Sequence, residues 1–401
     1  WQPRFLTDYP LARCNDGSVA AYYYRPGAVH RRKWLVFLEG GGWCWDAKSC
    51  SLPLHKRLGT SNGFPRTPAD VEAWSGKLKG VLENSDRGPF KDWHIAYVRA
   101  CSNDAFLGDS SPREVAAAQR HEPGPGWYFR GRRIVEATLK DLRRRTGLGE
   151  QSSDLLLYGG RSSGGRGALV TLDLISTSHA GGARVVGLFD APLDVPIQPM
   201  YPDLDSSDDE TRKAFVLANT SGALGSPECE AAHPGAQRWK CLGPSHRLPF
   251  VRTPYFLAQS QYDSWGITQN IFGVFLPMAP MTEEQQAYAE RYRREALRRL
   301  PHPSGASGVA VFSPARFLHC MLSEDSFYGI DAAGVPLQAA LRSWLATTPA
   351  YATTEDLRDT CRGFDCGHGR RRHAAAHFAP RTVSTTPSGR QVLEAAAALL
   401  V

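Results

Sequence analysis

The stretch Tyr158-Gly159-Gly160-Arg161-Ser162-Ser163-Gly164-Gly165 says most about how this chain folds. It contains a G-x-S-x-G pattern, with an apolar run before it and a helix-compatible segment, Gly165 to Ser176, after it. Gly160 and Gly164 permit a tight turn from a strand into a helix, where side chains would clash with neighbouring elements. Such a turn lifts a serine hydroxyl above the edge of a sheet, so the pattern predicts Ser162 as a nucleophile.

Short apolar runs alternate with helix-like stretches along the chain. Strands are predicted over residues 33–38, 94–99, 155–158, 184–189, 255–259 and 309–312. Helices are predicted over 130–146, 165–176, 269–275 and 283–300, the last preceded by a capping box at Thr282 and Gln285. Strands that are apolar on both faces and separated by helices predict an α/β fold with a mostly parallel sheet.

The domain organisation is read from composition. We expect one α/β domain over residues 1–401, since no internal repeat is visible. Residues 201–250 mix charge, Pro, Gly and two cysteines without periodicity, which indicates an insertion or lid. Residues 347–388 are also irregular and carry Cys361 and Cys366. No run of about 18–20 uncharged apolar residues occurs, so we expect no membrane span.

Several features favour secretion. The chain begins at Trp1, which is compatible with the removal of a targeting segment. Several of its nine cysteines lie close together in sequence, as in disulfide loops, and disulfides persist in oxidising compartments. No C-x-x-C pair occurs, which argues against zinc. Asn219 starts one glycosylation motif. We expect an extracellular protein, with the cell wall as one location.

The formal net charge of +7 favours acidic partners. Much of it is local, in Arg370-Arg371-Arg372-His373, Arg293-Arg294 and Arg298-Arg299. These groups either lie on solvated helix faces and in a flexible C-terminal loop, or they attract a polyanion such as an acidic polysaccharide. No aromatic-interleaved basic motif occurs, so we expect no nucleic-acid partner. The oligomeric state stays open.

A serine nucleophile needs a base, and the base needs an orienting carboxylate. Ligands of parallel sheets bind beyond the carboxyl ends of the strands, so both partners should follow strands. Asp263 follows the run 255–259 and is the candidate acid, with capping of the next helix as the alternative. His319 follows the run 309–312 and is the candidate base, with a buried structural histidine as the alternative. The order Ser, Asp, His is typical of hydrolases with this serine turn.

A glycine-rich segment, Leu38-Glu39-Gly40-Gly41-Gly42-Trp43-Cys44-Trp45, follows the first strong strand. Consecutive glycines let the backbone approach a ligand and point N–H groups at it. Gly42 and Trp43, with Ser163, are therefore candidate donors to an oxyanion, and a turn without a ligand is the alternative. Neither the P-loop nor the dinucleotide pattern is present, so we expect no cofactor.

Five blocks resemble the pectin acetylesterase family, whose animal branch contains the Notum deacylases. The blocks are residues 38–44, 129–134, 160–165, 262–265 and 317–320, in family order. The resemblance implies an α/β-hydrolase fold, secretion, no metal, a triad of Ser162, Asp263 and His319, and a Gly-Gly-Gly-Trp oxyanion hole. The last two blocks look closer to the plant-type members. The family usually has Ala after the nucleophile, whereas this chain has Ser163, a change that leaves the backbone N–H in place.

Most of the cysteines can be paired within the fold that this resemblance implies. We expect the pairs Cys44–Cys50, Cys229–Cys241 and Cys14–Cys101, while Cys320, Cys361 and Cys366 leave one odd thiol with the pairing open. Arg161 and Arg166 flank the serine turn. We expect each to form a surface ion pair, with binding of a uronate carboxylate as the alternative.

The expected function is that of a serine carboxylesterase that removes O-acetyl groups from an acidic polysaccharide such as pectin. Ser162 attacks, His319 moves the proton and Asp263 orients His319. One alternative is a Notum-like deacylase that removes a palmitoleoyl group from protein. Another, from a different class, is an inactive glycan-binding module on the same fold. The sequence leaves the natural substrate and the acyl length open.

Overall fold

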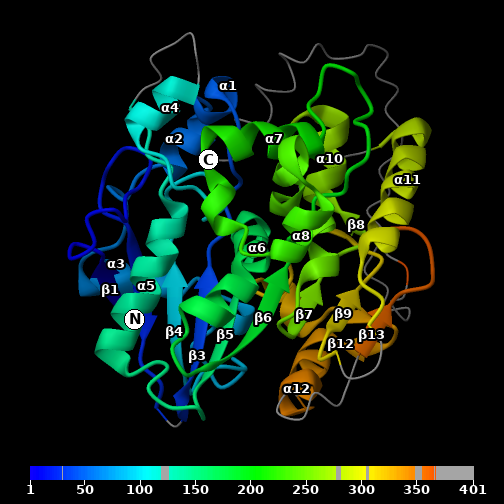
Figure 1. Cartoon of the computed structure of the whole chain (residues 1–401). Helices are drawn as coiled ribbons and strands as arrows, with labels where there is room; N and C mark the ends of the chain where they lie inside the picture. The colour runs from blue at the N-terminus through cyan, green and yellow to red at the C-terminus, as the bar shows by residue number, and fades with distance from the viewer. Residues whose placement is uncertain are drawn as a thin grey trace.

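One twisted sheet runs through the molecule (Figure 1). The computed structural model describes residues 1–28, 30–118, 126–276, 281–303, 307–347, 355–364 and 366, and within them nine strands form this sheet. In spatial order they are β1 (Gln2–Phe5), β2 (Ala21–Arg25), β4 (Trp93–Val98), β3 (His30–Leu38), β5 (Leu155–Arg161), β6 (Arg184–Asp190), β7 (Tyr255–Ala258), β9 (Ala310–Ser313) and β13 (Glu355–Arg358). Neighbours from β4 to β13 are parallel, and β1 and β2 pair antiparallel at one edge. The predicted α/β fold with a mostly parallel sheet is confirmed.

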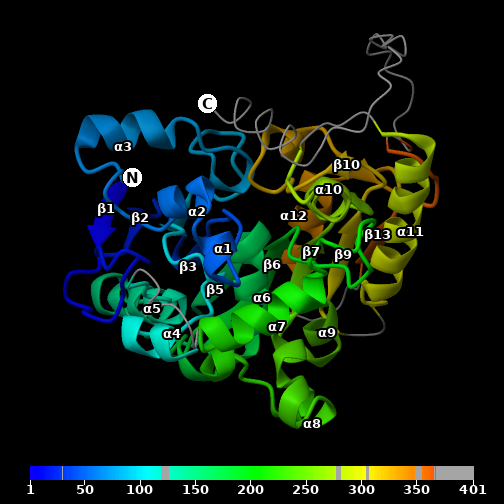
Figure 2. The same ribbon diagram turned by 90° about the horizontal axis from the view of Figure 1, so that it is seen from above.

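Hydrophobic layers lie on both faces of the sheet. Helices α5 (Gly131–Thr146) and α6 (Ser162–Ser178) cover one face, and α12 (Leu337–Thr347) with the turn η1 (Gly80–Leu82) covers the other (Figure 2). Successive strand residues alternate between the layers, since Val36 belongs to the first and Leu35 and Phe37 to the second. Both faces are therefore apolar, which is why the strands read as continuous apolar runs.

The other described helices lie mainly at the carboxyl ends of the strands and beside the sheet. They are α1 (Ala47–Cys50), α2 (Pro53–Leu58), α3 (Pro68–Ser75), α4 (Pro112–Ala118), α7 (Ser207–Leu217), η2 (Thr220–Ala223), α8 (Pro227–Ala232), η3 (Gly235–Leu242), α9 (Pro244–Arg247), η4 (Leu248–Phe250), α10 (Ser264–Phe272), α11 (Glu283–Arg299) and η5 (Asp325–Tyr328). Two short strand pairs complete the list: β8 (Tyr262–Asp263) with β10 (Phe317–Leu318), and β11 (Asp331–Ala332) with β12 (Val335–Pro336).

All six predicted strands are present in the main sheet, but three of its other strands, β1, β2 and β13, were not predicted. β1 and β13 carry polar residues and are only partly buried, so they lack the apolar run of a central strand. β2 is fully buried and its three tyrosines were an available signal, because aromatic residues favour strands. The helix predicted over 269–275 instead spans Ser264–Phe272, with Gly273 at φ 69° ending it.

The segment 201–250, predicted to be irregular, is largely helical and lies between β6 and β7. Its helices are short and begin at Pro or behind Ser caps, so no long periodic pattern was available to read. Its assignment as a lid stays a prediction. Of the segment 347–388, residues 348–354, 365 and 367–388 lie outside the described residues, and the remainder forms β13 and a small disulfide loop.

Four disulfides tie the fold together. Cys14–Cys101, Cys44–Cys50 and Cys229–Cys241 confirm the three predicted pairs, and the fourth is Cys361–Cys366. Cys320 is the odd thiol: it is reduced and buried. The Cys14–Cys101 bond joins the N-terminal segment to the loop after β4, whereas the other three close short local loops.

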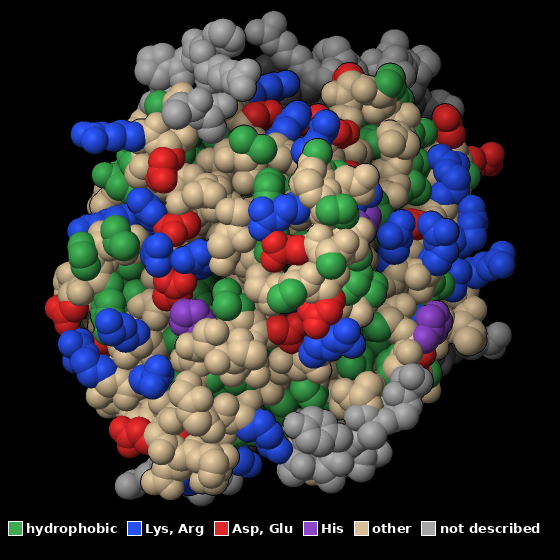
Figure 3. All heavy atoms as spheres, in the orientation of Figure 1, with side chains coloured by type: hydrophobic (Ala, Val, Ile, Leu, Met, Phe, Trp, Pro, Cys, Tyr) green, Lys and Arg blue, Asp and Glu red, His purple; other side chains and the backbone are tan. Residues whose placement is uncertain are grey.

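Basic side chains are spread over the face seen in Figure 3, including the edge where α11 lies. Of the two arginine pairs predicted there, Arg298 and Arg299 both bind Glu295, but Arg293 is buried against Gln261 and the Cys361 carbonyl, so it is not part of a solvated face. The Arg370–His373 cluster lies outside the described residues. Among the helices of the described residues, none combines the length and apolarity of a bilayer span.

Candidate active site

The serine of the G-x-S-x-G pattern stands where β5 passes into α6. Ser162 has φ 51°, in the left-handed region that costs energy for a residue with a side chain. A Cβ at Gly160 would lie 2.7 Å from the Leu38 carbonyl oxygen, and one at Gly164 only 2.4 Å from it. The glycines therefore let the turn press against β3, as the sequence predicted, and the strained backbone is held by this packing.

A two-stranded parallel ladder brings the candidate acid and base together. β8 pairs with β10 so that Asp263 stands beside Leu318, the residue before His319. The His319 Nδ1 atom lies 3.0 and 2.9 Å from the two carboxylate oxygens of Asp263. His319 Nε2 lies 2.8 Å from Ser162 Oγ. Three residues from distant parts of the sequence thus form one continuous hydrogen-bonded chain.

Asp263 also begins α10. Its Oδ1 accepts a hydrogen bond of 3.1 Å from the Gly266 N–H, and its Oδ2 accepts one of 3.1 Å from Gln259 Nε2. Asp263 is 1% exposed, so these donors replace the water that the carboxylate would otherwise bind. Both interpretations of Asp263 from the sequence, helix cap and partner of the histidine, are therefore true at once.

Two opposing effects act on the imidazole of His319. Burial lowers its pKa, but the Asp263 charge and its hydrogen bond outweigh burial and hold the pKa well above 6.5. Trp265 and Phe275 cover the ring, with centroids 6.2 and 6.0 Å away. With its proton on Nδ1, toward Asp263, the neutral imidazole keeps Nε2 free of a proton and facing Ser162. A base that acts on Ser162 requires this tautomer.

The glycine-rich loop after β3 lies against the serine turn. A Cβ at Gly40 would be 2.9 Å from the Ser162 Cβ, and Gly42 has φ 80°, so both positions suit glycine. Gly42, Trp43 and Ser163 line the same pocket as Ser162. Within the described residues, no hydrogen bond from the backbone N–H of Gly42 or of Trp43 is present. Free N–H groups at this point suit an oxyanion hole.

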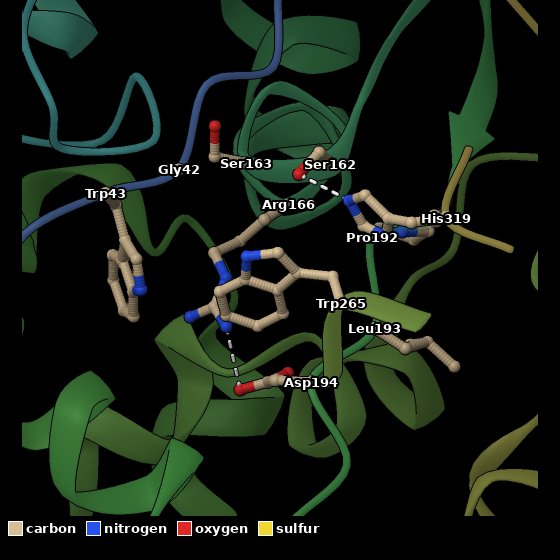
Figure 4. A pocket seen from close by; sticks show the side chains of 11 residues that line it. Gly42, Trp43, Ser162, Ser163, Arg166, Pro192, Leu193, Asp194, Trp265 and His319 are labelled. Atoms are coloured by element: carbon tan, nitrogen blue, oxygen red, sulfur yellow. Dashed lines mark hydrogen bonds and ion pairs between the residues drawn. The ribbon is translucent and has the colours of Figure 1, made fainter. Parts of the chain in front are cut away.

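The pocket in front of Ser162 is small and is lined by both apolar and polar side chains (Figure 4). Its volume is about 30 Å³, and one water molecule needs roughly 10–15 Å³ of such space. Its lining comprises Gly42, Trp43, Ser162, Ser163, Arg166, Ala191, Pro192, Leu193, Asp194, Trp265 and His319. Figure 4 shows Ser162 and His319 on one side and a pair formed by Arg166 and Asp194 on the other.

The two arginines beside the serine turn have different fates. Arg161 pairs with Glu324 near the surface, as expected. Arg166 does not form a surface ion pair: its side chain is 6% exposed, pairs with Asp194 at 3.0 Å and lies inside the pocket. The prediction failed because Arg166 follows Ser162 by four residues on α6 and therefore lies on the same helix face, under the pocket.

The segment after β6 was missed by the sequence analysis. Ala191 to Asp194 line the pocket, and the buried Asp190 accepts backbone hydrogen bonds from Met321 and Leu322, just after His319. The signal was available, because Asp190 directly follows the predicted strand 184–189 and polar residues after parallel strands converge on one edge of the sheet.

The strand order, the serine turn and the Ser-His-Asp arrangement together define an α/β-hydrolase. The crystal structure of the Wnt deacylase Notum from Drosophila superposes on this structure with a TM-score of 0.76 and 25% sequence identity, covering 90% of this chain and 96% of that one. The α/β-hydrolase fold implied by the resemblance is thus confirmed.

The chain belongs to the pectinacetylesterase family, whose model matches residues 4–361. It is 30% identical over 345 residues to the palmitoleoyl-protein carboxylesterase notum1 of Xenopus laevis, covering 82% of this chain and 64% of the relative. It is also 30% identical over 265 residues to pectin acetylesterase 5 of Arabidopsis thaliana, covering 64% of this chain and 55% of the relative. The chain therefore spans less than two thirds of these relatives. Their names are those of carboxylic ester hydrolases.

Proposed function

We propose that this protein is a secreted serine carboxylesterase that removes O-acetyl groups from an acidic polysaccharide such as pectin. The observation that carries the proposal is the hydrogen-bonded chain from Ser162 through His319 to Asp263, with a pocket of about 30 Å³ in front of the serine. The hydrogen-bonded chain supports ester cleavage, and the size of the pocket supports a small acyl group.

In this reaction His319 Nε2 takes the Ser162 proton while Oγ attacks the acyl carbon. The tetrahedral oxyanion accepts hydrogen bonds from the backbone N–H groups of Gly42, Trp43 and Ser163. The sugar oxygen leaves with the proton from His319, which forms an acyl-enzyme on Ser162. A water molecule, deprotonated by His319, then releases acetate and restores the serine. Asp263 stabilises the imidazolium in both steps.

The pocket favours acetate over a long acyl chain. A volume near 30 Å³ has room for two or so waters, and the methyl group of an acetyl ester is of similar size. A palmitoleoyl chain, which the names of several relatives specify, would need a far larger apolar tunnel. The far wall is instead an ion pair, which an apolar chain cannot replace favourably. Lipid deacylation is therefore the second candidate, supported by the similarity to those relatives alone.

Secretion and a polyanionic substrate have separate support. Four disulfides suit a protein that folds in an oxidising compartment. The net charge of +7 would attract a polysaccharide that carries uronate groups.

A panel of aryl esters with acyl chains from two to sixteen carbons tests the proposal. We expect kcat/KM to be highest for acetate, and Ser162→Ala to lower it by about 10⁴-fold or more. A matched variant, Ser178→Ala at the far end of the same helix, should keep full activity. Highest kcat/KM at sixteen carbons would favour the lipid deacylase. No hydrolysis of any ester, together with retained binding to pectin, would favour an inactive glycan-binding module.

A further inference from the structure

A buried ion pair closes the pocket opposite the serine. Arg166 Nη2 lies 3.0 Å from Asp194 Oδ2, and the two side chains are 6% and 3% exposed. The Arg166 guanidinium lies 4.0 Å from the centre of the Trp43 ring and donates to Thr211 Oγ1 at 3.3 Å. Packing, a hydrogen bond and an ion pair therefore hold this side chain in one position.

A second cavity lies directly behind this wall. It is lined by Asp194, Val195, Ser207, Glu210, Trp265, Gly266, Gln269, Asn270 and Tyr292, and its volume is only about 10 Å³. Asp194 and Trp265 line both cavities, so they form the partition between them. The Asp194 Oδ1 and Tyr292 hydroxyl atoms are buried without a hydrogen-bond partner in the described residues. A further small void, on the order of one water in volume, thus lies beyond the partition.

An acyl chain longer than acetate would meet this partition. To extend, the chain would have to push apart two buried charges, for each of which Thr211 is the only other side-chain hydrogen-bond partner in the described residues. Breaking a buried ion pair costs more than the burial of one or two methylene groups returns. The pair can therefore reject longer chains without touching the reacting atoms.

We propose that the Arg166–Asp194 pair is the specificity-determining wall that limits the acyl group to about the size of acetate, an inference that rests on the proposed function. Arg166 is one helical turn from Ser162, so the wall stands at a set distance from the reacting carbonyl. The second cavity becomes accessible only when the pair is removed.

The test is a gain of activity, which damage to the fold does not produce. The variant Arg166→Ala/Asp194→Ala removes both charges together, so neither is left buried alone. We expect its ratio of kcat/KM for aryl hexanoate to that for aryl acetate to rise at least about ten-fold over the unmodified protein. A second variant, Arg166→Leu/Asp194→Leu, keeps more of the packing volume and should raise the ratio about three-fold.

The matched control removes another buried ion pair from the same helix. Asp173 on α6 pairs with the fully buried Arg247 at 3.2 Å, and neither lines the pocket. Arg247→Ala/Asp173→Ala should leave the hexanoate-to-acetate ratio unchanged, whatever its effect on stability. Thermal unfolding reports which variants are folded.

The outcomes separate the two proposals. If the unmodified protein hydrolyses no ester, or prefers long chains, the proposed function is wrong. The unmodified protein could instead prefer acetate while every folded variant of Arg166 and Asp194 keeps the hexanoate-to-acetate ratio unchanged. The proposed function would then stand, and the assignment of the pair as a specificity wall would be wrong. An equal rise in the Asp173 control would also overturn the wall, because the effect would then follow from loosening α6. If neither wall variant folds, the pair is a structural element, and its assignment as a specificity wall is abandoned.

Discussion

The carboxylate of Asp190 accepts a hydrogen bond of 2.8 Å from the backbone N–H of Met321, two residues after His319. Its other oxygen accepts one of 2.9 Å from the Leu322 N–H, and Asp190 itself is fully buried. Between the base and these bonds lies Cys320, at φ 66°. The end of β6 thus holds the strained loop that presents His319 to Ser162, although Asp190 touches neither side chain of that pair.

Loss of the Asp190 carboxylate should loosen this loop. We expect Asp190→Ala to lower kcat for aryl acetate roughly 10- to 100-fold with little change in KM, because a misplacement of the base by about 1 Å is enough for such a loss. Asp154→Ala is the control: Asp154 is a buried carboxylate that also accepts backbone N–H bonds, from Gly149 and Gln151, but at the amino end of β5. Equal loss of kcat in both variants, per folded molecule, would contradict a role for Asp190 in positioning.

The pH dependence of catalysis should report the pair formed by Asp263 and His319. The base must be neutral, and the Asp263 charge holds the pKa of His319 above 6.5, so kcat/KM should fall as the pH drops through a value above 6.5. In Asp263→Asn that charge is gone, and the acid limb should move to lower pH while kcat falls about 10⁴-fold. A pH–rate profile of both proteins measures this. An acid limb that stays in place, or moves upward, would contradict the assignment.

Glu210 should make the fold less stable at alkaline pH. Burial raises its pKa to about 8, and the charges of Asp205 and Asp194 add to the rise while Arg166 opposes it. The unfolded chain ionises near 4.5 and the folded one near 8, so the folded state loses stability as the pH rises between these values. The full effect has an upper limit on the order of 5 kcal/mol.

Glu210→Gln removes that titration. We expect its melting temperature, relative to the unmodified protein, to rise steadily from pH 5 to pH 8. Glu228→Gln, at an exposed position, should change the melting temperature by the same amount at both pH values. If the difference for Glu210→Gln is also independent of pH, then Glu210 is ionised in the folded protein and this account is wrong.

The long disulfide should matter most for stability. Cys14 and Cys101 are 87 residues apart, whereas Cys361 and Cys366 are 5 apart. By loop-closure entropy, losing the first bond costs about 4–5 kcal/mol and losing the second about 2 kcal/mol. Chemical denaturation of the two double Cys→Ala variants measures this. Equal losses would mean that local packing, rather than the length of the closed loop, sets the contribution of each disulfide to the free energy of unfolding.

The sequence by itself determined the central sheet and the order of the reacting residues. Central parallel strands are buried on both faces, so each appears as an apolar run, and the serine turn requires glycines at defined spacings. Local rules were enough because Ser162 directly follows β5, and Asp263 and His319 come within six residues of the ends of β7 and β9. The edge strands β1 and β13 were not predicted because one side of each is in contact with solvent. The helices of 201–250 were not predicted because all of them except α7 span eight residues or fewer, too short to show a helical period.

Tertiary structure alone decided what stands opposite the serine. Nothing in the local sequence of Arg166 or Asp194 says that they meet, because α6 and the loop after β6 are separate elements whose contact depends on how the helix packs on the sheet. The same is true of Asp190 and Met321, which are 131 residues apart. The sequence predicted a nucleophile with its base and acid. The side chains that line the pocket in front of Ser162 come together through long-range packing, and packing of that kind produces no periodic pattern in the sequence.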